Sequence, residues 1–161
     1  MVVADTGPLI AFARLDLLAL LPDMLGTVWV HKVVLNECLY VPTRADAKAI
    51  QQAADSGLLK IWVEQLTDAG DWPPTLGAGE QSVIRLAQQF GCQVLMDDKL
   101  ARRVAAAVGL SVIGTAGVLI KARRLARIEA IAPLLHTLQT SGYYFAPHLV
   151  EHILHLAGEQ D

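Results

Sequence analysis

Acidic residues stand directly after two short apolar runs of the sequence. Asp5 follows Val2–Ala4, and the pair Asp97 and Asp98 follows the apolar residues 94–96. Each run predicts a buried strand of a parallel sheet, and ligands of open parallel sheets bind at the carboxyl ends of the strands. The three aspartates are therefore candidates for one site at that edge of the sheet.

Two glutamates are expected to join the aspartates, because both lie on apolar faces of predicted helices. Glu37 shares a helical face with Val34 and Tyr40. Glu80 shares one with Ile84 and opens its helix, where the helix dipole favours an ionised carboxylate. Both glutamates are therefore predicted to point inward, away from bulk water.

Converging carboxylates would need compensation. Two unit charges about 5 Å apart at an effective dielectric of about 20 repel each other by roughly 3 kcal/mol. The cluster must then take up protons through raised pKa values or hold a cation. Oxygen ligands suit Mg²⁺ or Mn²⁺, and Mg²⁺ leaves positions open for a phosphate oxygen. The pattern therefore predicts metal-assisted hydrolysis of phosphodiesters, in which the ion activates water and stabilises the leaving oxygen.

Each acid also has a purely structural interpretation. Asp98 could cap the helix that begins at Lys99, and Asp5 could form an Asx turn before the following glycine. Glu37 and Glu80 could be half-buried partners of arginines. The functional interpretation depends on the coincidence of these positions.

Apolar runs alternate with longer helical patterns, which predicts an α/β fold with a central parallel five-stranded sheet flanked by helices. The predicted strands cover residues 2–4, 27–30, 59–63, 93–96 and 111–113. The predicted helices cover residues 8–20, 32–40, 44–54, 80–90, 99–108, 116–126, 128–140 and 147–156. Thr43 with Asp46 resembles a capping box. Three glycines stand where left-handed helix ends are expected: Gly57, Gly91 and Gly109.

The composition is that of a single domain over residues 1–161, with 53% hydrophobic and 18% charged residues. Charges at Asp5, Arg14, Asp16 and Asp23 interrupt the apolar start of the sequence, so neither a membrane span nor a secretory signal is predicted. Cys38 and Cys92 are too few for a disulfide framework or a zinc site and suggest thiols of a cytoplasmic protein. The net charge of −3 argues against binding nucleic acid by bulk charge alone.

The chain resembles the PIN-domain family, close to its VapC-type ribonuclease toxins. The motifs that carry the resemblance are DTGPLI at residues 5–10, GAGE at 77–80, the pair 97–98 followed by Ala-Arg-Arg at 101–103, and GTAGVL at 114–119. Together they span roughly residues 2 to 157. The resemblance implies an α/β/α sandwich with an acidic pocket that holds Mg²⁺ or Mn²⁺ for cleaving single-stranded RNA.

The resemblance also assigns individual residues. The matches to the family's catalytic and metal-binding acids are Asp5, Glu37, Glu80 and Asp98, with Asp97 beside the last as a further metal ligand. The matches to its ligand-orienting hydroxyls are Thr6 and Thr115. Met96-Asp97-Asp98 replaces the usual Thr-x-Asp, so which aspartate faces the metal stays open. Glu80 stands where the toxins usually have Asp.

A basic segment could contact a polyanion locally. Seven of the 13 basic residues fall within residues 99–127, which contain no acid: Lys99, Arg102, Arg103, Lys121, Arg123, Arg124 and Arg127. Phosphate contact is one interpretation, while solvated helix faces or a docking site for an acidic partner are others. The predicted RNA contacts are Lys99, Arg102 and Arg103.

Two further patterns have competing interpretations. The histidines at 148, 152 and 155 recur at helical spacing and could bind a soft metal, although surface positions also explain them. Tyr143, Tyr144 and Phe145 could stack on bases, pack in the core or form a dimer contact.

The prediction is a cytoplasmic Mg²⁺- or Mn²⁺-dependent endoribonuclease, the toxin of a toxin–antitoxin pair. The resemblance also implies a homodimer and a small antitoxin protein that blocks the pocket. One alternative is a PIN fold without catalysis that serves as a binding module, which Glu80 and the apolar tail favour. The other is a receiver-like phosphoacceptor domain, which would need an acceptor aspartate at the end of a third strand.

Overall fold

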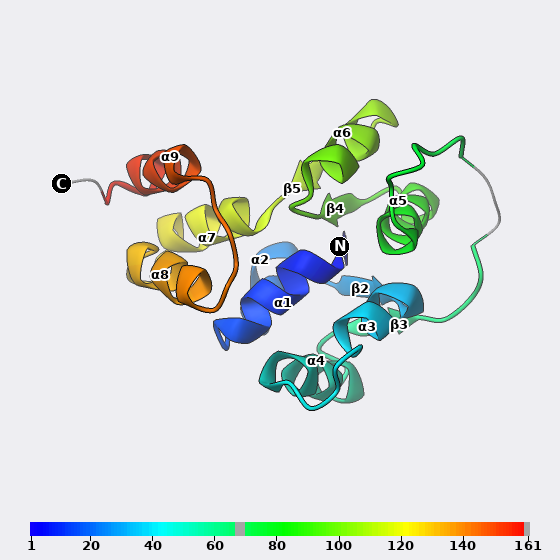
Figure 1. Ribbon diagram of the computed structural model, residues 1–161, viewed down its shortest axis with the longest axis horizontal. Helices are drawn as coiled ribbons and strands as arrows, with labels where there is room; N and C mark the ends of the chain where they lie inside the picture. The colour runs from blue at the N-terminus through cyan, green and yellow to red at the C-terminus, as the bar shows by residue number, and fades with distance from the viewer. Residues whose placement is uncertain (67–69, 160–161) are drawn as a thin grey trace.

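The centre of the protein is a five-stranded, all-parallel β-sheet (Figure 1). A computed structural model describes residues 1–66 and 70–159. The strands are β1 (Val2–Ala4), β2 (Val28–His31), β3 (Lys60–Trp62), β4 (Gln93–Leu95) and β5 (Val112–Ile113). Their order across the sheet is β3-β2-β1-β4-β5. The predicted parallel sheet with five strands is thus confirmed.

The direction of winding reverses between β1 and β4. Strand β1 continues into β2 on one side, whereas β4, from the second half of the chain, lies on its other side. The Asp5 backbone N–H donates to the Leu95 carbonyl at 2.9 Å, so the carboxyl ends of β1 and β4 lie side by side. Such a switch point is where open α/β sheets bind ligands.

Helices surround the sheet. They are α1 (Thr6–Arg14), α2 (Leu20–Leu25), α3 (Lys32–Cys38), α4 (Ala45–Asp55), α5 (Ala78–Phe90), α6 (Lys99–Ala107), α7 (Thr115–Arg124), α8 (Ala132–Thr140) and α9 (Pro147–Ala157). Helix α5 packs on β1, β2 and β4, and α7 contacts α1, α2 and α9. Figure 1 shows α7, α8 and α9 gathered at the end of the molecule that carries the C-terminus. Among the described residues, no helix has both the length and the apolar character needed to cross a bilayer.

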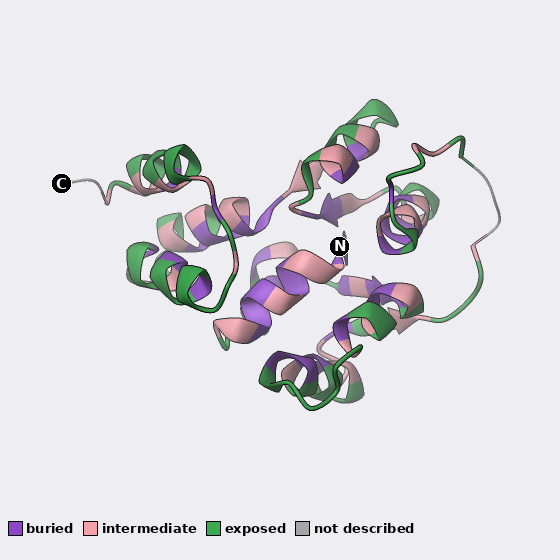
Figure 2. Cartoon of the chain, in the orientation of Figure 1, coloured by how far each residue is buried: buried purple, intermediate pink, exposed green. Residues whose placement is uncertain are grey.

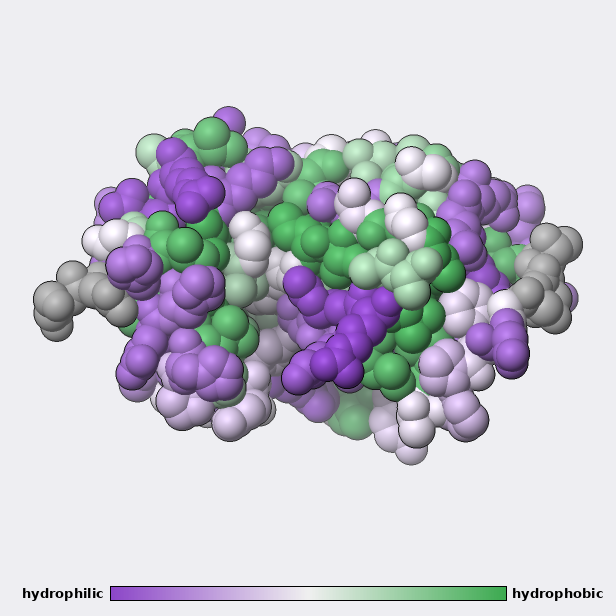
Figure 3. Space-filling view, turned by 90° about the horizontal axis from the view of Figure 1, so that it is seen from above, coloured by the Kyte–Doolittle hydropathy of each residue, from purple (hydrophilic) through white to green (hydrophobic). Residues whose placement is uncertain are grey.

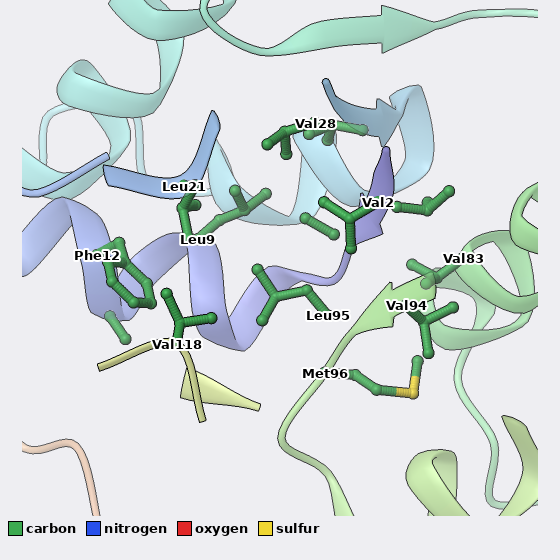
Figure 4. Packing of buried hydrophobic residues seen from close by; sticks show 14 of the residues in the cluster. Val2, Leu9, Phe12, Leu21, Val28, Val83, Val94, Leu95, Met96 and Val118 are labelled. Atoms are coloured by element: carbon green, nitrogen blue, oxygen red, sulfur yellow. The ribbon is translucent and has the colours of Figure 1, made fainter. Parts of the chain in front are cut away.

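The core fills both faces of the central strands. All three residues of β1 are completely buried, as expected for a parallel strand covered on both sides (Figure 2). In Figure 4, Leu95 lies toward Leu9 and Val118, while its neighbour Val94 lies toward Val83 of α5. The alternation of successive side chains between the two layers holds the strand ends, and the residues that follow them, in place.

The predicted helix over residues 8–20 is wrong in its extent, because α1 ends at Arg14 and α2 begins at Leu20. Asp16 adopts a left-handed backbone with φ of 55°, a conformation that aspartate tolerates better than most residues. The Leu17 N–H then bonds back to the Phe12 carbonyl at 2.8 Å. This turn buries Leu18 and redirects the chain toward β2.

The predicted capping box of Thr43 and Asp46 is also wrong. The N-cap of α4 is Arg44, and no side chain caps it. Asp46 is instead buried between two guanidinium groups, with its Oδ2 3.1 Å from Arg14 and 2.8 Å from Arg44. Burial acts to raise the pKa of Asp46, but the hydrogen bonds from the two arginines outweigh it and lower that pKa.

The helix predicted over residues 128–140 begins only at Ala132. The Glu159 carboxylate accepts hydrogen bonds from the backbone N–H groups of Ile131 at 2.6 Å and Ala132 at 2.8 Å. A residue near the end of the chain therefore satisfies the amino end of α8, which local sequence could not show. The three predicted left-handed glycines are confirmed, with φ of +79° at Gly57, +64° at Gly91 and +85° at Gly109.

Candidate functional site

Asp5 lies where β1 ends and α1 begins, with only 6% of its surface exposed. Burial, together with the negative charges of Glu80, Glu37 and Asp97, raises the pKa of its carboxyl group to about 7. The Thr6 backbone N–H acts in the opposite direction. The structure therefore brings three acids from distant parts of the chain within electrostatic reach of the buried Asp5 carboxylate.

Glu37 comes from α3 and lies at the rim of the site. Its side chain is exposed, as is Tyr40 at 87%, so the predicted inward orientation of this helix face is wrong. The short helix α3 buries only Val34 and Cys38, which leaves Glu37 at the edge of that contact. The carboxylate is nevertheless held in place, because the Thr6 hydroxyl donates to its Oε2 at 2.7 Å.

The amino end of α5 makes room for the Glu37 carboxylate. A Cβ atom at Gly79 would lie 2.6 Å from both Oε1 and Oε2 of Glu37, closer than real contacts allow. Gly79 itself is buried, and Glu80 follows it in the first turn of the helix. The Glu80 side chain, predicted to point inward, is only partly buried and folds back against Gly77. Gly77 and Gly79 thus leave space for two different carboxylates.

The two consecutive aspartates make different contacts. Asp97 is partly buried and accepts three hydrogen bonds: the Thr115 N–H at 2.8 Å on Oδ1, and the Thr115 hydroxyl at 2.6 Å and the Tyr143 hydroxyl on Oδ2. Asp98 is exposed and caps α6, since its Oδ2 accepts the Ala101 N–H at 2.9 Å. The capping role considered for Asp98 is therefore observed.

Tyr143 belongs to the candidate site through a contact with Asp97 that the sequence did not predict. It lies between α8 and α9, and its hydroxyl reaches Asp97 across 46 residues of sequence. Burial raises the pKa of the Tyr143 hydroxyl, and the Asp97 charge raises it further, so the hydroxyl keeps its proton as a donor. The only sequence signal was the aromatic run 143–145, which carries no information about this partner.

The basic segment does not form one uniform surface. Arg102 donates to the Met96 carbonyl at 3.0 Å and, with Lys99, lines a pocket beside Asp97. Arg103 is exposed. Three other cations bind elsewhere: Lys121 donates to the Met24 carbonyl, Arg123 pairs with Glu159, and Arg127 pairs with Asp23. Within residues 99–127, Lys99 and Arg102 are thus the cations seen beside the acids.

The acids around Asp5 offer oxygen ligands, which suit a hard divalent ion. The Glu37 carboxylate in the space left by Gly79 and the buried Asp5 fit such an ion, because both present oxygens that a cation would compensate. In residues 1–66 and 70–159, however, no three Asp, Glu, His or Cys side chains lie close enough together to hold a metal directly. Mg²⁺ commonly binds through few carboxylates and retains several waters.

The comparison with protein families agrees with this arrangement. A family model described as a PIN domain matches residues 1–159, almost the full length of the chain. No curated protein matches the chain. The match covers every acid discussed above together with Tyr143 and the glutamate that caps α8. The chain therefore belongs to the PIN-domain family.

Proposed function

We propose that this protein is a divalent-metal-dependent endoribonuclease that hydrolyses RNA phosphodiester bonds. PIN domains are generally nucleases that use divalent ions. The observation that carries the proposal for this chain is the position of Asp5, which is buried at the switch point of the sheet with Glu37, Glu80 and Asp97 around it. Such a group of acids destabilises the protein unless protons or a cation compensate it.

The proposed roles follow from the contacts of each side chain. Asp5, Glu37 and Asp97 would hold Mg²⁺ or Mn²⁺, with Glu80 at its side, and Thr6 and Thr115 orient two of these carboxylates. A bound divalent ion would lower the pKa of an attacking water and offset charge on the phosphate. Asp98, the other match to the family's acids, caps α6 through its Oδ2, and we therefore assign the ion to Asp97. Lys99 and Arg102 line the pocket beside Asp97, where their positive charges would hold a phosphodiester.

We also propose the biological role that the resemblance to VapC-type toxins implies. The protein would act as the toxin of a toxin–antitoxin pair in the cytoplasm, as a homodimer, with a small antitoxin protein blocking the acidic site. An antitoxin that covers the acids would need cationic side chains, because the buried Asp5 carboxylate requires a compensating charge.

Cleavage of single-stranded RNA by metal-free protein, with and without added Mn²⁺, tests the proposed activity. Wild-type protein is expected to cleave only with Mn²⁺, and Asp5→Asn is expected to lower the rate by about a hundredfold or more, as loss of an essential electrostatic group does. The control is Asp16→Asn, which changes an exposed aspartate outside the site. No cleavage by the wild type would favour the binding module without catalysis, and equal cleavage by the Asp5 variant would show that Asp5 is not needed for the reaction.

Gly79→Ala is expected to lower Mn²⁺-dependent cleavage by about tenfold or more without unfolding the protein. The added Cβ would displace the Glu37 carboxylate, which is the mobile end of an exposed side chain, and break its bond with Thr6. Stability should be unchanged or higher by up to about 1 kcal/mol, because Ala favours a helix more than Gly does. Initial rates and thermal melting measured on the same preparation check both parts.

The control for this substitution is Gln88→Ala, which adds an alanine at an exposed position nearer the other end of α5. If Gly79→Ala cleaves as fast as the Gln88 variant, the position of the Glu37 carboxylate is irrelevant to the reaction.

A further inference from the structure

A pocket of about 940 Å³ opens between α6, β5 and the segment that joins α8 to α9. This volume lies within the usual range for small-molecule sites, about 300–1,000 Å³. Asp97 and Asp98 form part of its wall, so the pocket adjoins the acids of the proposed active site. Residues 142–149, from the C-terminal part of the chain, close its other side.

The walls of this pocket differ in chemistry. Ile113 and Phe145 supply apolar surface, and Gly114 and Gly117 contribute no side chains. Lys99 and Arg102 supply positive charge on the wall next to Asp97, and Arg102 is fixed there by its bond to the Met96 carbonyl. Figure 3, which views the molecule from the side of α6 and α9, shows hydrophobic and strongly hydrophilic residues side by side on this face.

Tyr144 is the most exposed aromatic residue of the pocket. This residue is 80% exposed, whereas the neighbouring Phe145 is 7% exposed and packs against Tyr143 with ring centroids 5.3 Å apart. The core therefore uses Tyr143 and Phe145 and leaves Tyr144 with an uncovered face. An exposed aromatic face beside cations and apolar surface is typical of sites that stack bases and hold phosphates.

These features select one class of occupant. A flat, partly apolar group would cover Tyr144 and Ile113, and an attached anion would lie near Lys99 and Arg102. A nucleotide of single-stranded RNA combines both parts in one unit. An acidic peptide would satisfy the cations but offers no flat face for an exposed ring, so the aromatic residue favours RNA.

We infer that this pocket binds the nucleotide next to the scissile phosphate, with its base against Tyr144 and its phosphate near Lys99 and Arg102. The inference rests on the proposed nuclease function for the position of the scissile bond. It adds that the segment between α8 and α9 is part of the substrate site, and that this segment contributes to the choice of the base beside the cleaved bond.

Binding of short, fluorescein-labelled oligoadenylate and oligouridylate RNA to the full-length protein in EDTA tests the pocket without cleavage. Tyr144→Ala is expected to weaken binding by about fivefold to a hundredfold, the usual range for loss of one stacked base. Tyr144→Phe, which keeps the ring, should bind like the wild type. The matched control is Tyr40→Ala, because Tyr40 is 87% exposed and does not line the pocket.

A second variant tests the phosphate contact. Lys99→Ala should weaken the binding of both RNAs to a similar degree. It should also reduce the slope of log affinity against log salt by the amount expected for about one phosphate contact. Lys48→Ala on α4, which lies outside this pocket, serves as the control. Both helices are expected to remain folded, since each lysine is exposed and alanine favours a helix.

The outcomes separate the pocket from the nuclease proposal. Weaker binding by Tyr144→Ala and Lys99→Ala but not by their controls supports the pocket, even if no RNA is cleaved. Absence of RNA binding by the wild type, or equal binding by the wild type and the Tyr144→Ala variant, overturns the pocket. Cleavage by the Tyr144→Ala variant with an unchanged KM would also overturn it, and would leave the nuclease proposal standing.

Discussion

Replacing Asp5 by Asn is expected to stabilise the metal-free protein against unfolding, by an amount that grows with pH to about 4 kcal/mol near pH 8. The buried carboxyl group has a pKa raised to about 7, against an ordinary value of 3.8. Asparagine fills the same space without carrying a charge. The substitution that removes activity is thus expected to remove a destabilising group as well.

The direction of this effect follows from proton binding. At the acid end, both the folded and the unfolded chain hold the proton on Asp5, and the two proteins should be equally stable. Above the ordinary pKa of 3.8 the unfolded chain loses the proton while the folded chain keeps it until its own pKa of about 7. Each pH unit in this window therefore costs the wild type about 1.4 kcal/mol, and the loss is constant above it.

Urea unfolding of the wild type and Asp5→Asn in EDTA, over a series of pH values, measures this difference directly. Titrating groups remote from Asp5 affect both proteins equally and cancel in the comparison. Asp16→Asn, an exposed control, should differ from the wild type by a constant amount at all pH values. If the free energies of unfolding of the wild type and Asp5→Asn change in parallel with pH, the pKa of Asp5 is not raised in the folded protein.

Added Mn²⁺ should reverse the order of the two proteins. The ion replaces the proton as compensation for Asp5, so its binding at acid pH must release that proton. The apparent affinity of the wild type for Mn²⁺ is therefore expected to rise by up to about tenfold per pH unit below the raised pKa and to level off above it. Millimolar Mn²⁺ should raise the melting temperature of the wild type and leave that of Asp5→Asn nearly unchanged.

The sheet was predictable from sequence because buried parallel strands are continuous apolar runs, and the residues that follow them stand at one edge. The run Val2–Ala4 places Asp5, and the run before Asp97 places the second acid, without any tertiary information. Apolar periodicity likewise placed Glu37 and Glu80 on helices near that edge. It could not show that Glu37 lies at the rim, because burial depends on how far the short helix α3 extends past its neighbours.

Contacts over long sequence separations account for the rest. Asp46 looked like a local cap, but Arg14 and Arg44 bind it, and the Arg14 contact exists only after α1 packs against α4. The bond from Tyr143 to Asp97 has the same origin, since α8 must first fold back beside α1. That bond distinguishes Asp97 from Asp98 in the structure, and local sequence could not show it.

Asp97→Asn is expected to lower Mn²⁺-dependent RNA cleavage by about a hundredfold or more, whereas Asp98→Asn should change it by less than about threefold. Three donors converge on the Asp97 carboxylate: the N–H and hydroxyl of Thr115 and the hydroxyl of Tyr143. An ionised carboxylate accepts on both oxygens, but an asparagine side chain must turn its NH₂ group toward one set of donors. The side chain would then lose its position.

The Asp98 side chain accepts the Ala101 N–H at 2.9 Å and so caps α6. Asparagine caps helices about as well as aspartate, so that substitution preserves α6 while removing the charge. Each of the two variants thus removes one negative charge, at adjacent positions. A difference between their rates shows which position matters, because the change in net charge is the same. Initial rates at saturating Mn²⁺, with circular dichroism to confirm folding, measure the difference.

Tyr143→Phe extends the comparison, because it removes one donor to Asp97 and leaves the acid unchanged. Its cleavage rate should be about tenfold below that of the wild type, as expected for a group that positions a ligand. This rate would lie between those of Asp98→Asn and Asp97→Asn. If the Asp98 variant loses activity while the Asp97 variant keeps it, Asp98 is the functional acid and its capping bond must break when metal binds. The bond between Tyr143 and Asp97 would then serve only to hold the α8–α9 segment on the fold.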